Sequence, residues 1–119
     1  QEKLYTLAMR GNEVFRYAVA HMKDSALSLI NRTGIKPEDV GLVIPHQANL
    51  RIINAVAQRL GIPTERVFVN VHKYGNTSGA AVAIALDEAV KTGRARKGDI
   101  VLLVTFGAGL TWSSAAIRL

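Results

Sequence analysis

The side chains that could do chemistry in this sequence lie in three short polar segments. These segments read PHQAN at 45–49, HKYGNTSG at 72–79 and FGAGLTW at 106–112. A neutral imidazole at His46 and the amide of Asn76 would each present an N–H, and two such donors form a pocket for a developing oxyanion. Neither donor has to change its protonation state. The pair therefore suits the enolate of a thioester, where loss of one well-placed donor costs on the order of 3 kcal/mol.

The same segments supply no nucleophile. Backbone N–H groups in the turn formed by Gly107, Ala108 and Gly109 could hold a tetrahedral intermediate, but Thr77 and Ser78 adjoin no obvious base. The chain contains no cysteine, which excludes a cysteine nucleophile, a disulfide and a thiolate metal site within it. We expect no metal site of any kind. An attacking group would have to come from outside this sequence.

Each segment also has a purely structural interpretation. A histidine is more often structural than catalytic, and we assign the structural role to His21 and His72. The segment YGNTSG fits a turn with Gly75 and Asn76 at positive φ before a helix, and FGAG fits an ordinary hairpin turn. The functional interpretation depends on the three segments meeting in space.

Two helices and a buried strand are predicted in the first half of the chain. Apolar residues spaced by three and four predict a helix over 14–30, which Asn12 would cap and Gly34 would end. The continuous apolar run 40–45 predicts a strand buried on both faces. A second helix is expected over 49–61, capped by its first residue and ended by its last.

The same order then repeats. A strand is predicted over 66–71, a helix over 78–93 and a third strand over 99–106. This alternation predicts parallel crossovers and an α/β architecture with helices on both faces of the sheet. Only a short turn precedes the last strand at 112–119, so that strand should run antiparallel. Because the carboxyl ends of parallel strands meet at one edge, the three polar segments should converge there.

Composition narrows the class of protein. The chain of 119 residues is 49% hydrophobic, which fits one soluble domain, and no apolar run is long enough for a membrane span. Its first residues do not read as a signal peptide, so we expect a cytoplasmic protein. The net charge of +6 and the pI of about 10.1 indicate an acidic partner. Few aromatic residues and no recognised motif argue against nucleic acid.

Together the motifs resemble those of a known family. VIPHQANLRII, YGNTSGAA and FGAGLTW, with GNEVF upstream, are similar in order and spacing to the C-terminal portion of β-ketoacyl-acyl-carrier-protein synthase III. The resemblance covers essentially all 119 residues. It implies a thiolase-like half with a mixed, mostly parallel sheet and an antiparallel last strand. It also implies that residues 1–119 form the C-terminal portion of a condensing enzyme whose N-terminal half is absent from this chain.

The resemblance further implies a Cys-His-Asn triad. The family's cysteine, in the N-terminal half, takes an acyl group such as acetyl from acyl-CoA. The histidine and asparagine assist decarboxylation of malonyl-acyl carrier protein, whose carbanion attacks the acyl-cysteine. By motif, His46 and Asn76 correspond to that histidine and asparagine. Phe106 corresponds to the phenylalanine beside the cysteine, and Gly107–Gly109 to an oxyanion loop that often has a glycine where this chain has Ala108.

Substrate and partner positions are implied in the same way. The positions that resemble the lining of the family's pantetheine tunnel are Gly11, Asn12, Phe15, Ala48 and Asn49. Arg51 corresponds to an arginine implicated in docking the acidic acyl carrier protein, and Arg16 and Arg59 are basic positions of the same type. CoA and phosphopantetheine thioesters would be substrates, and no cofactor would be bound permanently.

Two alternatives remain open at this point. A related polyketide-type condensing enzyme shares the triad, and a non-catalytic fragment could bind pantetheine or carrier protein without chemistry. The implied fold is a five-stranded sheet that lacks its opening strand, unless KLYTLAM at 3–9 replaces it. An open sheet exposes edge groups and apolar surface. We therefore expect this chain to pack against an N-terminal half, within an enzyme that is a homodimer when complete.

Overall fold

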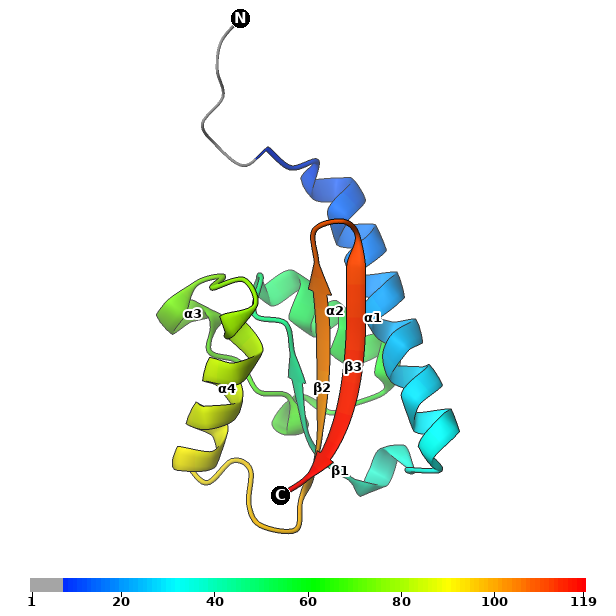
Figure 1. Ribbon diagram of the computed structural model, residues 1–119, viewed down its shortest axis with the longest axis vertical. Helices are drawn as coiled ribbons and strands as arrows, with labels where there is room; N and C mark the ends of the chain where they lie inside the picture. Colours follow the sequence, from blue (N-terminus) through cyan, green and yellow to red (C-terminus); the bar gives the residue numbers. More distant parts are fainter. Residues whose placement is uncertain (1–7) are drawn as a thin grey trace, which may run out of the picture.

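A computed structural model describes residues 8–119 as a sheet with helices on both faces (Figure 1). No helix in this described range is both long and apolar enough to cross a membrane. The elements, in chain order, are α1 (Gly11–Thr33), η1 (Pro37–Asp39), β1 (Val40–Pro45), α2 (Leu50–Leu60), η2 (Thr64–Arg66), α3 (Val71–Tyr74), α4 (Ala80–Lys91), β2 (Ile100–Gly107) and β3 (Thr111–Arg118).

The sheet is mixed and has the strand order β1-β2-β3. β1 pairs with β2 in parallel and β2 pairs with β3 antiparallel, which confirms the predicted direction of the last strand. A single parallel bridge joins Val43 to Val67 on the other side of β1. The possible replacement strand at 3–9 lies largely outside the described residues.

β1 is buried on both faces, as predicted. Successive side chains of a strand point to opposite faces. Val43 belongs to a cluster with Met22 of α1 and Ile53 of α2, whereas Leu42 belongs to a second cluster with Ala85 of α4. Consequently α1 and α2 cover one face of the sheet and α4 covers the other (Figure 1).

Both ends of α2 form as predicted. The N-cap residue, Asn49, is extended, and its Oδ1 accepts a hydrogen bond from the Ile52 N–H at 2.9 Å. Gly61 ends the helix with φ of 66°, the left-handed conformation that glycine adopts without a side-chain clash. The helix buries the apolar residues Ile52, Ile53, Val56 and Leu60.

The start of α1 differs from the prediction. The helix begins at Gly11, and Arg10 occupies the N-cap position without a side-chain hydrogen bond. Asn12 therefore lies inside the first turn and does not cap the helix. Glu13 also lies in that turn, where a carboxylate interacts favourably with the helix dipole. The predicted end is confirmed, because Gly34 has φ of 70° and donates to the Ile30 carbonyl.

The strand predicted over 66–71 is wrong. η2 occupies the start of this segment, α3 begins at Val71, and only Val67 pairs with β1. The Phe68 N–H donates to the Val43 carbonyl at 2.9 Å, but beyond this point the backbone groups of the segment bond to the side chain of Gln47. The side-chain amide of Gln47 makes hydrogen bonds that a neighbouring strand would otherwise make. The hydrophobic pattern of the sequence does not reveal this substitution.

The helix predicted over 78–93 is shorter at both ends, since α4 spans Ala80–Lys91. The positive φ in the preceding turn belongs to Gly75 and Ser78, at 68° and 54°, and not to Asn76. The reason is local: Asn76 Oδ1 accepts the Ser78 N–H at 2.9 Å, which forms a turn closed by the side chain.

We predict that Gly61→Ala lowers the free energy of unfolding by about 1 kcal/mol, because alanine is strained at a left-handed φ. No heavy atom lies within 4 Å of the added Cβ, so the cost is conformational rather than steric. Gly11→Ala is the matched control: its added Cβ also meets nothing within 4 Å, but Gly11 is helical. Urea unfolding measures both variants, and an equal loss in the two would contradict the assigned cap.

Candidate active site

His46 follows β1 directly and is half-buried. Its backbone N–H donates to the Val104 carbonyl at 2.7 Å, which continues the contact between β1 and β2 by one residue. Its carbonyl accepts from the Ala48 N–H at 3.0 Å, which forms the turn into α2. Burial lowers the pKa of His46, because desolvation disfavours the charged imidazolium. At neutral pH the ring is therefore the neutral donor that the predicted chemistry requires.

Asn76 lies in the exposed turn between α3 and α4. Its oxygen is engaged by the Ser78 N–H, and its Nδ2 donates to no protein atom within residues 8–119. The adjoining Thr77 hydroxyl is the one buried side-chain polar atom in that range without a hydrogen-bond partner. Unpaired buried polar groups are costly and uncommon, and they call for an explanation such as a functional role. The geometry leaves the Asn76 amide available as a donor.

The glycine turn joins β2 to β3 as a hairpin, so its structural interpretation is also correct. Phe106, at the end of β2, is half-buried and packs against the same cluster as Ala48. Gly109 has φ of 131°, which only glycine tolerates well. Ala108 lies outside the left-handed region, so the alanine at this position costs the turn no backbone strain.

Hydrogen bonds link the first polar segment to the residues that lead into the other two. The hydrogen bond from His46 to Val104 holds the first segment against the strand that ends in Phe106. Gln47, in the same segment as His46, bonds to Phe68, Asn70 and Val71, which lead through α3 to the turn of Asn76. The first and third segments therefore lie at the carboxyl ends of β1 and β2, and the second is linked to the first through Gln47 although no regular strand precedes it.

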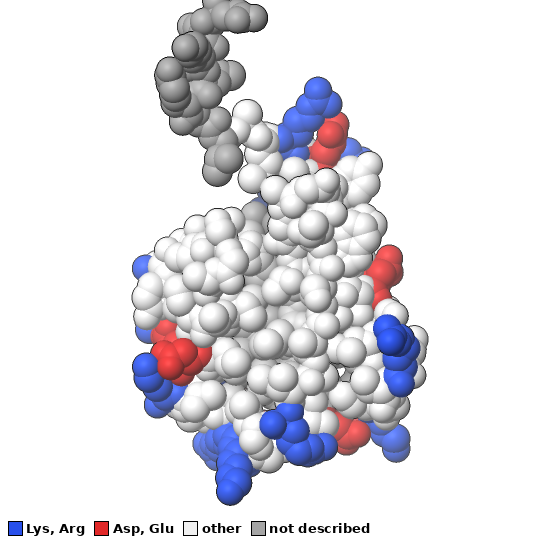
Figure 2. Space-filling model, viewed as in Figure 1, with Lys and Arg blue, Asp and Glu red and all other residues white. Residues whose placement is uncertain are grey.

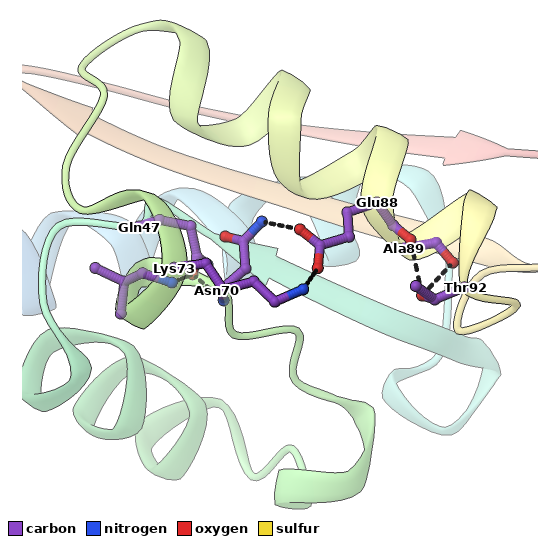
Figure 3. Close-up of polar contacts among 7 residues, drawn as sticks. Gln47, Asn70, Lys73, Glu88, Ala89 and Thr92 are labelled. Atoms are coloured by element: carbon purple, nitrogen blue, oxygen red, sulfur yellow. Dashed lines mark hydrogen bonds and ion pairs between the residues drawn. The ribbon is translucent and has the colours of Figure 1, made fainter.

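Gln47, Asn70 and Glu88 form a polar network that the sequence analysis did not identify (Figure 3). Gln47 and Asn70 are only 1% and 2% exposed. Asn70 Nδ2 donates to Glu88 Oε2 at 3.1 Å, and Glu88 also pairs with Lys73 of α3. The hydrogen bond from Lys73 lowers the pKa of Glu88. The sequence feature that could have indicated this network is the presence of polar residues in two otherwise apolar segments, VIPHQAN and VFVNV.

A cleft of about 310 Å³ lies between the N-terminal ends of α1 and α2. Its lining consists of Gly11, Asn12, Phe15, Asn49, Leu50 and Arg51. Four of the five predicted pantetheine positions meet here, together with the predicted docking residue Arg51, whose Cζ lies 5.0 Å from the centre of the Phe15 ring. Ala48 does not line this cleft, and Leu50 is a lining residue that the sequence analysis missed.

The other two predicted docking arginines and His21 do not line this cleft. Arg16 is exposed on α1 and does not line it, and Arg59 follows Arg51 by eight residues on α2, about 12 Å along the helix axis. A larger cleft of about 410 Å³ runs between α1 and β3 and contains no predicted site residue, so its size does not mark the chemistry. His21 stacks on Trp112 with ring centres 3.9 Å apart, which agrees with a structural role.

Residues 30–119 match the family described as 3-oxoacyl-[acyl-carrier-protein (ACP)] synthase III C terminal. The chain belongs to this family. Among the curated relatives of this chain, β-ketoacyl-[acyl-carrier-protein] synthase III of Roseiflexus sp. is 59% identical over 110 residues, which are 92% of this chain and 33% of that protein. The chain therefore spans about a third of the length of that relative.

Solved structures agree with the family assignment and the fold. The 3-oxoacyl-[acyl-carrier-protein] synthase III from Aquifex aeolicus is 48% identical, with a TM-score of 0.94 over 99% of this chain and 38% of its own. The priming β-ketosynthase from the R1128 polyketide pathway is 41% identical, with a TM-score of 0.88 over 96% of this chain and 34% of its own. The thiolase-like α/β half predicted from the sequence is confirmed.

We predict that Asn49→Ala destabilises this synthase III chain by about 1 kcal/mol, because the Ile52 N–H loses its cap. Asn54→Ala, an exposed position within α2, is the matched control and should be neutral or slightly stabilising. Asn49→Asp should retain the cap. Thermal unfolding compares the three variants, and no difference between the two alanine variants would show that the cap contributes nothing.

Proposed function

We propose that this chain is the C-terminal part of a β-ketoacyl-ACP synthase III, an acyltransferase that joins the acyl group of acyl-CoA, such as acetyl-CoA, to malonyl-acyl carrier protein and so starts fatty-acid synthesis. The supporting observation is the loop of His46. It holds a half-buried histidine with a lowered pKa and bonds to both neighbouring segments that carry candidate residues. Family membership supplies the reaction class.

In the proposed reaction, a cysteine from outside this chain first accepts the acyl group, and CoA leaves as the thiol. The malonyl thioester then loses CO₂, and the electron pair of the broken C–C bond forms an enolate. The His46 ring N–H and the Asn76 amide N–H stabilise the enolate oxygen. The enolate carbon attacks the acyl-cysteine carbonyl, and the C–S bond breaks to release the cysteine thiolate. The glycine turn offers backbone N–H groups to the tetrahedral oxyanion.

The cysteine-bearing part has a surface on which it could pack. The middle of the face that α4, β2 and β3 present carries no Lys, Arg, Asp or Glu, and the charges lie around its margin (Figure 2). Leu86, Leu103 and Ile117 are only partly buried on this side of the sheet, and Val90 is 48% exposed. Exposed apolar area of this kind indicates an interface. We propose that the N-terminal half covers it, within an enzyme that forms a homodimer in the cytoplasm.

The proposed substrates enter as thioesters, so no permanently bound cofactor is required. The cleft between α1 and α2 would take the pantetheine arm of CoA or of the acyl carrier protein, with Arg51 at its rim facing an acidic carrier. Arginine attracts such a partner mainly by steering the encounter.

A second candidate function is a related polyketide-type condensing step, which the likeness to the R1128 priming β-ketosynthase favours. The two differ in the carrier protein that delivers the malonyl group. Comparing turnover with fatty-acid and polyketide carrier proteins, each loaded with the same malonyl thioester, discriminates between them. A fragment that only binds would show saturable carrier binding and no turnover even with the cysteine-bearing part present.

We predict that His46→Ala in the complete enzyme lowers malonyl decarboxylation by about 100-fold or more, because the enolate loses one of its two donors. Acyl transfer from CoA to the cysteine should change by less than about threefold, since it does not form that enolate. His72→Ala, at an exposed position on α3, is the control. Product CO₂ and acyl-enzyme are measured separately. Decarboxylation that survives in the His46 variant would remove the proposed role.

We predict that Arg51→Glu raises the KM for malonyl-acyl carrier protein by about tenfold at low salt and that the difference shrinks above about 300 mM salt. Lys97→Glu makes the same charge change just before β2, at the opposite edge of the sheet, and should leave this KM unchanged. Steady-state kinetics at two salt concentrations measure both variants. Equal effects would mean that only net charge matters and that Arg51 has no docking role.

A further inference from the structure

Gln47 is the buried neighbour of His46, and every hydrogen-bonding capacity of its amide is used. Its Oε1 accepts from the Asn70 N–H at 2.9 Å and from the Val71 N–H at 3.1 Å. Its Nε2 donates to the Pro45 carbonyl at 2.7 Å and to the Phe68 carbonyl at 3.2 Å. An amide offers two acceptor sites and two donor hydrogens, so none is left for a ligand.

These four bonds join the backbone just before His46 to the backbone that leads to Asn76, and these are the two candidate catalytic side chains. The Pro45 carbonyl immediately precedes His46, and Val71 opens α3, whose last turn leads to Gly75 and Asn76. The Gly75 N–H returns to the Val71 carbonyl at 2.8 Å. Any displacement of the Gln47 amide is therefore transmitted to both segments.

The far end of the Asn76 turn is anchored through the same network. The Asn70 backbone N–H donates to Gln47 Oε1, and the Asn70 side chain donates to Glu88 of α4. Lys73 of α3 pairs with the same carboxylate (Figure 3). The turn that contains Asn76 is thus bounded by two helices that are tied to each other and to the His46 loop.

We propose that Gln47 is a positioning residue that sets the placement of the His46 imidazole relative to the Asn76 amide. This inference rests on the proposed function, because the two donors must reach one enolate oxygen. A buried apolar residue could fill the same space, but it would leave four backbone groups without partners. Misplacement by about 1 Å can cost on the order of 100-fold in rate, so a shift too small to unfold the protein would still be measurable.

The test is Gln47→Glu in the complete enzyme. The substituted carboxyl retains an oxygen for the Asn70 and Val71 N–H groups. When protonated it donates to one carbonyl, and when ionised it places negative charge against the Pro45 and Phe68 oxygens. We expect burial and those oxygens to outweigh the two N–H donors and to raise its pKa above that of an exposed glutamate. The variant is therefore most nearly normal at low pH and loses the native geometry as pH rises through the raised pKa.

We expect the decarboxylation kcat of Gln47→Glu to fall by about 10- to 100-fold relative to the parent as pH rises, while cysteine acylation stays within about threefold. Gln58→Glu, the same change at an exposed residue of α2, is the matched control and should follow the parent at every pH. The ionisable and charged groups beside the network are His46, Glu88, Lys73, Tyr74 and Arg94. All of them are present in both variants, so their own titration cancels in the comparison.

Two results would overturn the inference. In one, decarboxylation and acylation decline together with the folded fraction, measured by thermal unfolding at each pH, and Gln47 is then only structural. In the other, Gln47→Glu follows Gln58→Glu throughout. If Gln47→Glu does not fold at high pH, the ratio of the two half-reactions at the highest pH at which it folds decides the question, and a ratio equal to that of Gln58→Glu overturns the inference. A His46→Ala variant that retains decarboxylation overturns the proposed function, whereas a fully active Gln47→Glu beside an inactive His46→Ala overturns positioning alone.

Discussion

The parallel pairing of β1 with β2 is the constraint on which the rest of the structure depends. β1 contributes Val43 to the core under α1 and α2 and Leu42 to the core under α4, so a slip of one residue would exchange the two faces. The same register pairs Pro45 with Val104 and so places the His46 N–H where it donates to the Val104 carbonyl. Core packing therefore determines where the candidate catalytic loop begins. The position of His46 thus depends on apolar contacts elsewhere in the sheet.

On the other side of β1 the strand pairing stops after Val67, and side-chain hydrogen bonds replace it. Pro45 cannot donate to a neighbouring strand, because it has no N–H. Buried backbone groups must nevertheless be satisfied, and Gln47 satisfies those of Pro45, Phe68, Asn70 and Val71. Because of these side-chain bonds, the segment after Val67 can leave the sheet and enter α3 with its backbone groups still paired.

The elements that rest on strong local signals were predictable from the sequence. Asn49 and Gly61 bound α2 because an N-cap amide and a left-handed glycine act within one turn. The direction of β3 followed from the short turn before it. The Asn12 cap failed because helix ends depend on several weak, competing contributions. The prediction of a strand over 66–71 was wrong because the apolar pattern is the same whether a neighbouring backbone or a side chain supplies the hydrogen bonds.

Some residues of the candidate site could likewise be proposed from the sequence, and others could not. His46 and Asn76 could be proposed from the sequence alone, because an imidazole and an amide are hydrogen-bond donors by residue type. The Gln47 network could not, because its members are distant in sequence and act through buried backbone groups. The meeting of Phe15 with Arg51 also required the tertiary structure, because it depends on how α1 lies against α2.

Asn49 and Asn76 are held in the same way. Each commits one acceptor site of its side-chain oxygen to a backbone N–H of its own segment, at 2.9 Å in both cases. One acceptor site of the oxygen and both N–H hydrogens then remain on each amide. The backbone bond fixes the plane of the amide and, with it, the direction in which the NH₂ group donates. Because neither amide titrates, this orientation does not depend on pH while the fold is intact.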